Sequence, residues 1–120
     1  MGPLRHTLTK DERLHGQKDI SRLIAEGKFG VAGSLKYCFR AGNGLSYTRI
    51  MVAVPKKLFK RAVKRNLLKR RLRESYRLQK GLADGTEGMD IMFVYNSREI
   101  LPFKDIYSQV GQILTKVRKP

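Results

Sequence analysis

Residues 60–77, which read KRAVKRNLLKRRLRESYR, restrict the possible folds more than any other stretch of this chain. Nine of these eighteen residues are Lys or Arg and only one is acidic. Leu68, Leu72 and Tyr76 recur at steps of four, which places them within an arc of about 80° on an α-helix. This pattern predicts a long helix over about 59–79 that packs on a core through a narrow apolar face.

Polar side chains occupy a neighbouring arc of roughly 100° on the same helical wheel. They are Lys69, Arg73, Asn66, Arg77 and Arg70. Arginine guanidinium groups match phosphate oxygens in a bidentate manner, and Lys adds a point charge. Asn66 carries no charge and could contact a base edge or a sugar hydroxyl. The arc therefore predicts a rigid row of phosphate-binding groups. A solvated helix surface usually mixes Lys with Glu, which this one does not.

The whole chain is also basic, with 26 Lys and Arg against 10 Asp and Glu and a net charge of +16 over 120 residues. Such a charge favours a polyanionic partner, with nucleic acid first and an anionic membrane surface second. A helix lying on a membrane would need a broader apolar face. No apolar run approaches the ~20 residues that span a bilayer. There is no signal peptide, and Cys38 has no second cysteine to pair with, so we expect a cytoplasmic protein.

A short helix is expected before the basic one. In residues 18–27, KDISRLIAEG, apolar side chains follow the i, i+3, i+4 rule from Ile20 to Ile24. Gly27 stands where a left-handed residue would end this helix.

The strand pattern follows directly. Residues 31–40 alternate, which places Leu35, Tyr37 and Phe39 on one face of a strand. The opposite face of that strand carries Lys36, Cys38 and Arg40. Residues 47–54 read as a buried strand, and the Asn-Gly pair between the two runs predicts an antiparallel hairpin.

The remaining elements are an interior strand over 89–96 and an amphipathic helix over 102–117. The order of helix, strands, helix, strand, helix predicts an α+β sandwich around one sheet. We expect a single domain over residues 1–120, with 1–14 loose or extended.

No protein-based hydrolytic site is visible in the sequence. His6 and His15 are isolated, and Cys38 reads as a small apolar residue. There is no pair of acidic residues that suggests a metal, no zinc spacing and no glycine-rich phosphate loop. The residues alone therefore indicate binding to RNA. A ribosomal or other structural RNA-binding protein stays open, and a helix-turn-helix DNA-binding module is less favoured because an apolar strand precedes the basic helix.

The basic helix also resembles a known family. AVKRNLLKRRLRESYR, with Arg65-Asn66 followed by Lys69-Arg70, looks like the signature of the bacterial ribonuclease P protein subunit. Three further segments resemble the same family in the same order. They are ERLHGQKDISRLIAEGK, RIMVAVPKK and GMDIMFVYN.

The resemblance implies an α+β sandwich in the order αβββαβα, with a four-stranded sheet and the basic helix in a left-handed βαβ crossover. It implies the protein subunit of an endoribonuclease that removes the 5′ leader of precursor tRNA. The catalyst would be the RNA subunit, with Mg²⁺ held mainly by that RNA, and the protein would contribute no catalytic residue. The implied partners are the catalytic RNA and the precursor tRNA leader, with no membrane and no required protein partner.

The resemblance also implies two sets of site residues. The RNA-binding set is Lys56, Lys57, Arg61, Lys64, Arg65, Asn66, Lys69, Arg70, Arg73 and Arg77. The leader cleft, between the first helix and the sheet, is implied at Ile20, Ile24, Lys36, Cys38 and Arg40. The chain departs from the family at several of these positions.

The chain has Leu67 where the family often has Arg, and Cys38 where the family has an aromatic residue. Ile20 and Ile24, where the family usually has Phe, could equally pack in the core. Because Cys38 replaces that aromatic residue, bases of the leader would lose a stacking partner unless Tyr37 or Phe39 supplies one. Core packing is the favoured role for both Tyr37 and Phe39.

Overall fold

The computed structural model describes residues 12–83 and 88–118 of the chain. Its elements follow the predicted order αβββαβα, with one short 3₁₀ helix (η2) added after the basic helix. They are α1 (Gln17–Glu26), β1 (Lys28–Ala32), β2 (Leu35–Ala41), β3 (Arg49–Ala53), α2 (Ala62–Gln79), η2 (Lys80–Ala83), β4 (Met89–Tyr95) and α3 (Phe103–Arg118).

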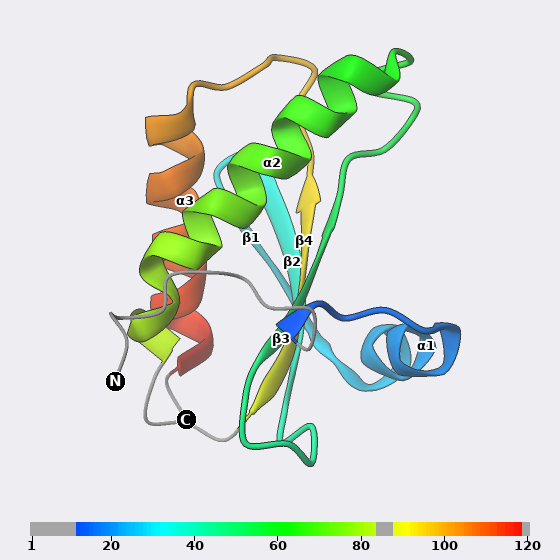
Figure 1. Ribbon diagram of the computed structural model, residues 1–120, viewed down its shortest axis with the longest axis vertical. Coiled ribbons are helices and arrows are strands. Elements are labelled where there is room, and N and C mark those ends of the chain that lie inside the picture. The colour runs from blue at the N-terminus through cyan, green and yellow to red at the C-terminus, as the bar shows by residue number, and fades with distance from the viewer. Residues whose placement is uncertain (1–11, 84–87, 119–120) are drawn as a thin grey trace, which may run out of the picture.

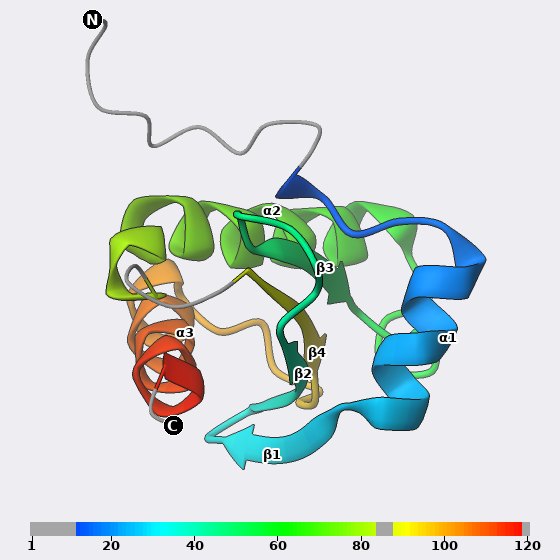
Figure 2. The same ribbon diagram turned by 90° about the horizontal axis from the view of Figure 1, so that it is seen from below.

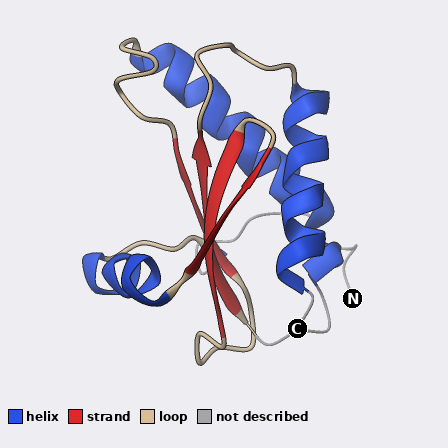
Figure 3. Cartoon of the chain, turned by 180° about the vertical axis from the view of Figure 1, so that it is seen from behind, coloured by secondary structure: helices blue, strands red, loops and turns tan. Residues whose placement is uncertain are grey.

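The four strands form one mixed sheet in the order β1-β2-β4-β3. Strands β1, β2 and β4 are antiparallel neighbours, whereas β3 runs parallel to β4 and reaches it through α2. Helices α2 and α3 cover one face of this sheet, and α1 lies against the other (Figures 1 and 2). The same arrangement is seen from behind in Figure 3. The basic helix is therefore the connection of a parallel crossover, as predicted.

The predicted hairpin between residues 31–40 and 47–54 is wrong. Strand β4 lies between β2 and β3 and pairs with β2 over seven residues, from Leu35 opposite Tyr95 to Ala41 opposite Met89. The connection over 42–48 therefore crosses to a strand that is not a neighbour. The physical reason is that β4, the most apolar strand, gains most from a central position where both of its faces are covered.

The single strand predicted over 31–40 is also wrong, because it contains a turn. Gly33 has a φ of +60°, a left-handed conformation that favours glycine, and it divides the stretch into β1 and β2. The Oε1 atom of Gln109 accepts a hydrogen bond of 3.0 Å from the backbone N–H of Ser34, which fixes this turn against α3. The two predicted faces of β2 are confirmed, since Tyr37 packs in the core and Lys36 is exposed on the opposite face.

The apolar face of α2 packs where the wheel placed it. Leu68, Leu72 and Tyr76 are buried in the main core between the sheet and the two helices. The rings of Tyr76 and Phe93 lie 6.4 Å apart. Burying each of these side chains stabilises the fold by about 1.5–3 kcal/mol, so α2 is firmly fixed on the sheet.

A second, smaller core lies beneath α1 and contains Leu14, Leu23 and Cys38. The thiol of Cys38 donates a hydrogen bond of 3.4 Å to the carbonyl of Leu23. Gly27 follows the helix, but its φ of −79° shows that the predicted left-handed stop is wrong. A Cβ at Gly27 would lie 2.6 Å from the sulfur of Cys38, so glycine is needed for close packing instead.

Part of the segment predicted to be loose or extended is anchored on the sheet. The backbone N–H of Leu14 donates a hydrogen bond of 2.6 Å to the carbonyl of Ile50, next to an isolated parallel bridge between Arg13 and Ile50. The side chain of Leu14 is buried. Residues 1–11 of that prediction lie outside the described residues.

A buried ion pair ties the sheet to α1. Asp90 is only 2% exposed and accepts hydrogen bonds from Nε and Nη2 of Arg49 at 2.9 and 2.8 Å. Nη1 of Arg49 donates to Asp19 of α1 at 3.1 Å, and Nδ2 of Asn43 donates to Asp90 at 2.9 Å. Hydrogen bonding to Asp90 raises the pKa of Arg49, which favours the charged form of this guanidinium group.

Candidate nucleic-acid interface

Helix α2 presents part of its predicted polar arc to solvent. Asn66 and Arg70 of that arc are exposed, and Lys69 is half-buried at the border with the core face. Lys64, which the resemblance implies and which lies outside that arc, is exposed as well. Within the described part of the chain, none of the three cations forms an ion pair. These groups are therefore available to a phosphate backbone, and the packed core beneath fixes the helix that carries them.

Arg65 is held differently from its neighbours. Its Nη1 atom donates hydrogen bonds of 2.7 Å to the carbonyls of both Phe59 and Lys60. The guanidinium thus fastens the chain as it enters α2, directly after the turn that carries the exposed Lys56 and Lys57. Its predicted contact with RNA stays a prediction, and it would have to use the remaining donors of the group.

Two more arginines of α2 also have partners within the protein. Nε of Arg77 donates to Oε1 of Glu74 at 3.0 Å, and this hydrogen bond lowers the pKa of Glu74. Arg71 was not in the predicted set, and it donates to the carbonyl of Leu101, in the loop before α3, at 2.5 Å. Arg61 is exposed at the N-terminal end of the helix.

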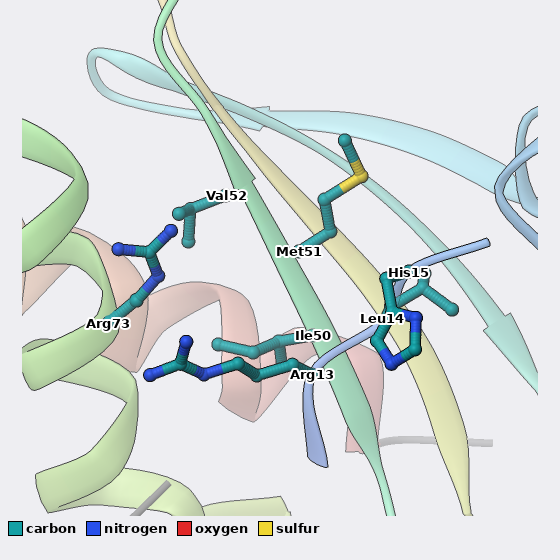
Figure 4. Close-up of a pocket in the computed structure, with 7 residues that line it drawn as sticks. All are labelled: Arg13, Leu14, His15, Ile50, Met51, Val52 and Arg73. Atoms are coloured by element: carbon teal, nitrogen blue, oxygen red, sulfur yellow. The ribbon is translucent and has the colours of Figure 1, made fainter. Parts of the chain in front are cut away.

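Arg73 reaches a cavity at the edge of β3 that the sequence did not predict. This cavity has a volume of about 220 Å³. Figure 4 shows the guanidinium groups of Arg13 and Arg73 on the same side of β3. The lining residues are Arg13, Leu14, His15, Ile50, Met51, Val52 and Arg73.

The two arginines of this cavity repel one another. Burial, and then the charge of Arg13, lower the pKa of Arg73. Neither forms an ion pair with an acid among residues 12–83 and 88–118. An anionic group bound between them would relieve the repulsion, so Arg13 joins the cationic surface of α2. Sequence reasoning missed Arg13 because its pairing with β3 is not visible from local periodicity.

The predicted cleft residues lie on the α1 side of the sheet, but not all are accessible. Ile20 packs on the small core, Ile24 is 49% exposed and Lys36 is exposed. Nε of Arg40 donates to Glu26 of α1 at 3.1 Å. Cys38 is fully buried beneath α1, so its thiol supports this surface from below and contacts no ligand in this conformation.

Tyr37 and Phe39 do not take the place of the missing cleft aromatic. Both side chains pack on the main core, on the face that α2 and α3 cover, and their ring centroids lie 6.3 Å apart. The favoured prediction of core packing for these two residues is therefore confirmed.

Residues 12–83 and 88–118 offer neither a metal-binding cluster nor a membrane-spanning helix. They contain no group of three His, Cys, Asp or Glu side chains placed to hold a metal ion. They also contain no helix with the length and apolar character needed to cross a bilayer.

Comparison with known proteins identifies the family. A family model described as Ribonuclease P matches residues 8–118. The chain belongs to the ribonuclease P protein family. The ribonuclease P protein component of Porphyromonas gingivalis is 43% identical over 82 residues, which cover 67% of this chain and 60% of that protein. The component of Petrotoga mobilis is 36% identical over 115 residues and covers 94% of both chains.

Solved structures of the ribonuclease P protein family share the fold. The RNase P protein from Thermotoga maritima superposes with a TM-score of 0.75 at 28% identity, covering 88% of this chain and 96% of that one. The sequence match spans less than two thirds of the length of the Porphyromonas protein. It spans nearly all of the Petrotoga protein. The predicted αβββαβα fold and the predicted family are thus both confirmed.

Proposed function

We propose that this chain acts as the protein subunit of ribonuclease P. In this role it binds the catalytic RNA subunit and the 5′ leader of precursor tRNA, and it supports Mg²⁺-dependent removal of the leader. The observation that carries the proposal is the row of exposed, unpaired cations on α2, held on a rigid core within a chain of this family.

Helix α2 is suited to RNA because its charges are fixed in space before binding. The eighteen residues of α2 extend over about 27 Å, at 1.5 Å per residue. Lys64, Lys69 and Arg70 would neutralise phosphates and release counterions, whereas Asn66 would contribute a hydrogen bond without charge. The remaining predicted contacts, from Lys56 to Arg77, are proposed on the same helix and on the turn before it.

The α1 side of the sheet is proposed to receive the single-stranded leader. Exposed Lys36 and half-buried Arg40 supply positive charge there, and Ile24 supplies apolar surface beside them. Ile20 would form the wall at the foot of α1. Cys38 would contribute only indirectly, by holding α1 at its distance from β2.

The chemistry is proposed to belong to the RNA subunit, with Mg²⁺ held mainly by that RNA. The donor set of the protein fits this division, because its exposed functional side chains on α2 are cations that repel Mg²⁺ rather than carboxylates that bind it. The holoenzyme would then work in the cytoplasm, with RNA as the necessary partner and no other protein required.

Reconstitution tests the proposal directly. The chain is mixed with a bacterial ribonuclease P RNA and precursor tRNA at low Mg²⁺, and release of the 5′ leader is measured. We expect cleavage to depend on the added protein, and expect Lys104→Ala, at an exposed position of α3, to behave like wild type. Tight binding to the RNA without any effect on cleavage would contradict the proposal and favour a structural RNA-binding protein instead.

A further inference from the structure

Strand β1 places two large apolar side chains in solvent. Phe29 is 66% exposed and Val31 is 56% exposed, among the most exposed large apolar residues of the described chain. They alternate with Gly30 and Ala32, which face the opposite side of the sheet. A Cβ at Gly30 would lie 2.4 Å from the ring of Tyr37, so there is no room for a side chain at this position on the core face of β1.

The register of the sheet identifies the face on which Phe29 lies. Directly opposite residues of an antiparallel pair project to the same side. Phe29 is opposite Cys38 and Val31 is opposite Lys36, so both apolar side chains project to the α1 side. Helix α1 covers Cys38 completely but stops short of Phe29, one strand further toward the edge.

Two cations flank Phe29 on that face. Lys36 and Arg40 precede and follow Cys38 by two residues on β2, and are therefore the diagonal neighbours of Phe29 across the strand pair. Lys36 is exposed. Arg40 is half-buried and is joined to Glu26, which is itself well exposed. An exposed aromatic ring between two cations is the combination that single-stranded nucleic acid binds, with a base on the ring and phosphates on the charges.

We propose that Phe29 is a stacking platform for one nucleotide of the precursor tRNA leader, so that the leader path extends from the α1 groove across β2 to the edge strand β1. This inference rests on the proposed function and adds a residue to it. Lys36 and Arg40 position the phosphates on either side of the stacked base. Because every base has a π-face, the contact discriminates weakly among sequences and depends on leader length instead.

A second copy of the chain is the other occupant to consider for this patch. Two chains that each carry a net charge of +16 repel one another. The patch also places positive charge directly beside its apolar side chains, which suits a polyanion and opposes self-association. The charge of the chain and of this patch therefore favours RNA.

The test is a series of precursor tRNAs whose leaders are shortened one nucleotide at a time. Affinity for the holoenzyme, reconstituted with the RNA subunit, is measured for wild type, Phe29→Ala, Phe29→Leu and Phe29→Tyr. Wild type should lose affinity by a step of about 5- to 150-fold when the stacked nucleotide is removed, the range for one base–aromatic stack. Phe29→Ala and Phe29→Leu should lack that step, and Phe29→Tyr should keep it.

Controls separate this inference from the proposed function. Ile100→Ala, which removes a partly exposed apolar side chain from the loop before α3, should keep the step. All variants should bind the RNA subunit as wild type does.

If wild type supports cleavage but the step is unchanged in Phe29→Ala, the stacking proposal is overturned and the proposed function stands. If Phe29→Ala instead converts a dimer into a monomer in sedimentation, the patch is a self-association surface. If wild type supports no cleavage, the proposed function fails first.

Discussion

Replacing Arg49 by Met should destabilise the fold strongly, because it leaves the buried Asp90 without its cationic partner. Arg49 supplies two of the three hydrogen bonds that Asp90 receives, and Asp90 is only 2% exposed. Removing one partner of a buried pair typically costs about 3–5 kcal/mol, because the other charge is left without compensation. Since Arg49 itself keeps some exposure to solvent, we expect about 3 kcal/mol, or roughly 10 °C in melting temperature.

Two further variants locate the origin of that loss. Asp19→Asn removes the negative charge that pairs with Arg49 from α1 at a partly exposed position, and should cost less than about 1 kcal/mol. The double variant Arg49→Met with Asp90→Leu removes both buried charges and should be more stable than Arg49→Met alone.

Urea unfolding followed by far-ultraviolet circular dichroism measures all three free energies. The reasoning is refuted if Arg49→Met lies within about 1 kcal/mol of wild type, or if the double variant is less stable than the single one.

Three other outcomes follow from the structure. Leu72→Ala, at a fully buried position of α2, should cost about 2–5 kcal/mol in urea unfolding, and a loss under 1 kcal/mol would contradict the packing of α2. Burial raises the pKa of the Cys38 thiol, so a thiol reagent near neutral pH should modify it only after unfolding; rapid labelling of the native protein would mean that α1 does not cover it. His6→Ala with His15→Ala should leave the cleavage step of the holoenzyme within a few-fold at saturation. A loss of 10²–10⁴-fold would place acid–base chemistry on the protein.

The sequence was sufficient where the determining pattern was local. The spacing of Leu68, Leu72 and Tyr76 predicted which face of α2 packs, because helical periodicity alone sets the direction of these side chains. The alternation along β2 likewise predicted that Tyr37 and Lys36 lie on opposite faces.

Prediction failed where residues far apart in the chain decide the outcome. The local sequence does not show whether β3 pairs with β2 or is separated from it by β4. The predicted hairpin was wrong for this reason. The turn at Gly33 was hidden because Val31 keeps the two-residue apolar spacing of Leu35, Tyr37 and Phe39, although after the turn these residues lie on opposite faces of the sheet.

The candidate site shows the same division between local and distant information. The exposed position of Arg70 and Asn66 was predicted from the wheel, but the meeting of Arg13 with Arg73 requires the pairing of the N-terminal segment with β3. Phe29 was missed because residues 28–30 were not predicted to form a strand, and Tyr37 and Phe39 were the aromatic residues predicted to lie near the cleft strand. The register that places Phe29 beside Cys38 exists only in the folded sheet.

The most direct test of the account is the affinity of the ribonuclease P RNA for Arg70→Ala and Asn66→Ala over a range of salt concentrations. Lys104→Ala, which removes an exposed charge from α3, is the matched control. All three should melt close to wild type, since surface changes are usually within about 0.5 kcal/mol. Arg70→Ala should bind more weakly with a salt slope reduced by about one unit, Asn66→Ala should bind more weakly with the slope unchanged, and Lys104→Ala should match wild type. Equal affinities and slopes for all four proteins would contradict the claim that α2 is the RNA-binding surface.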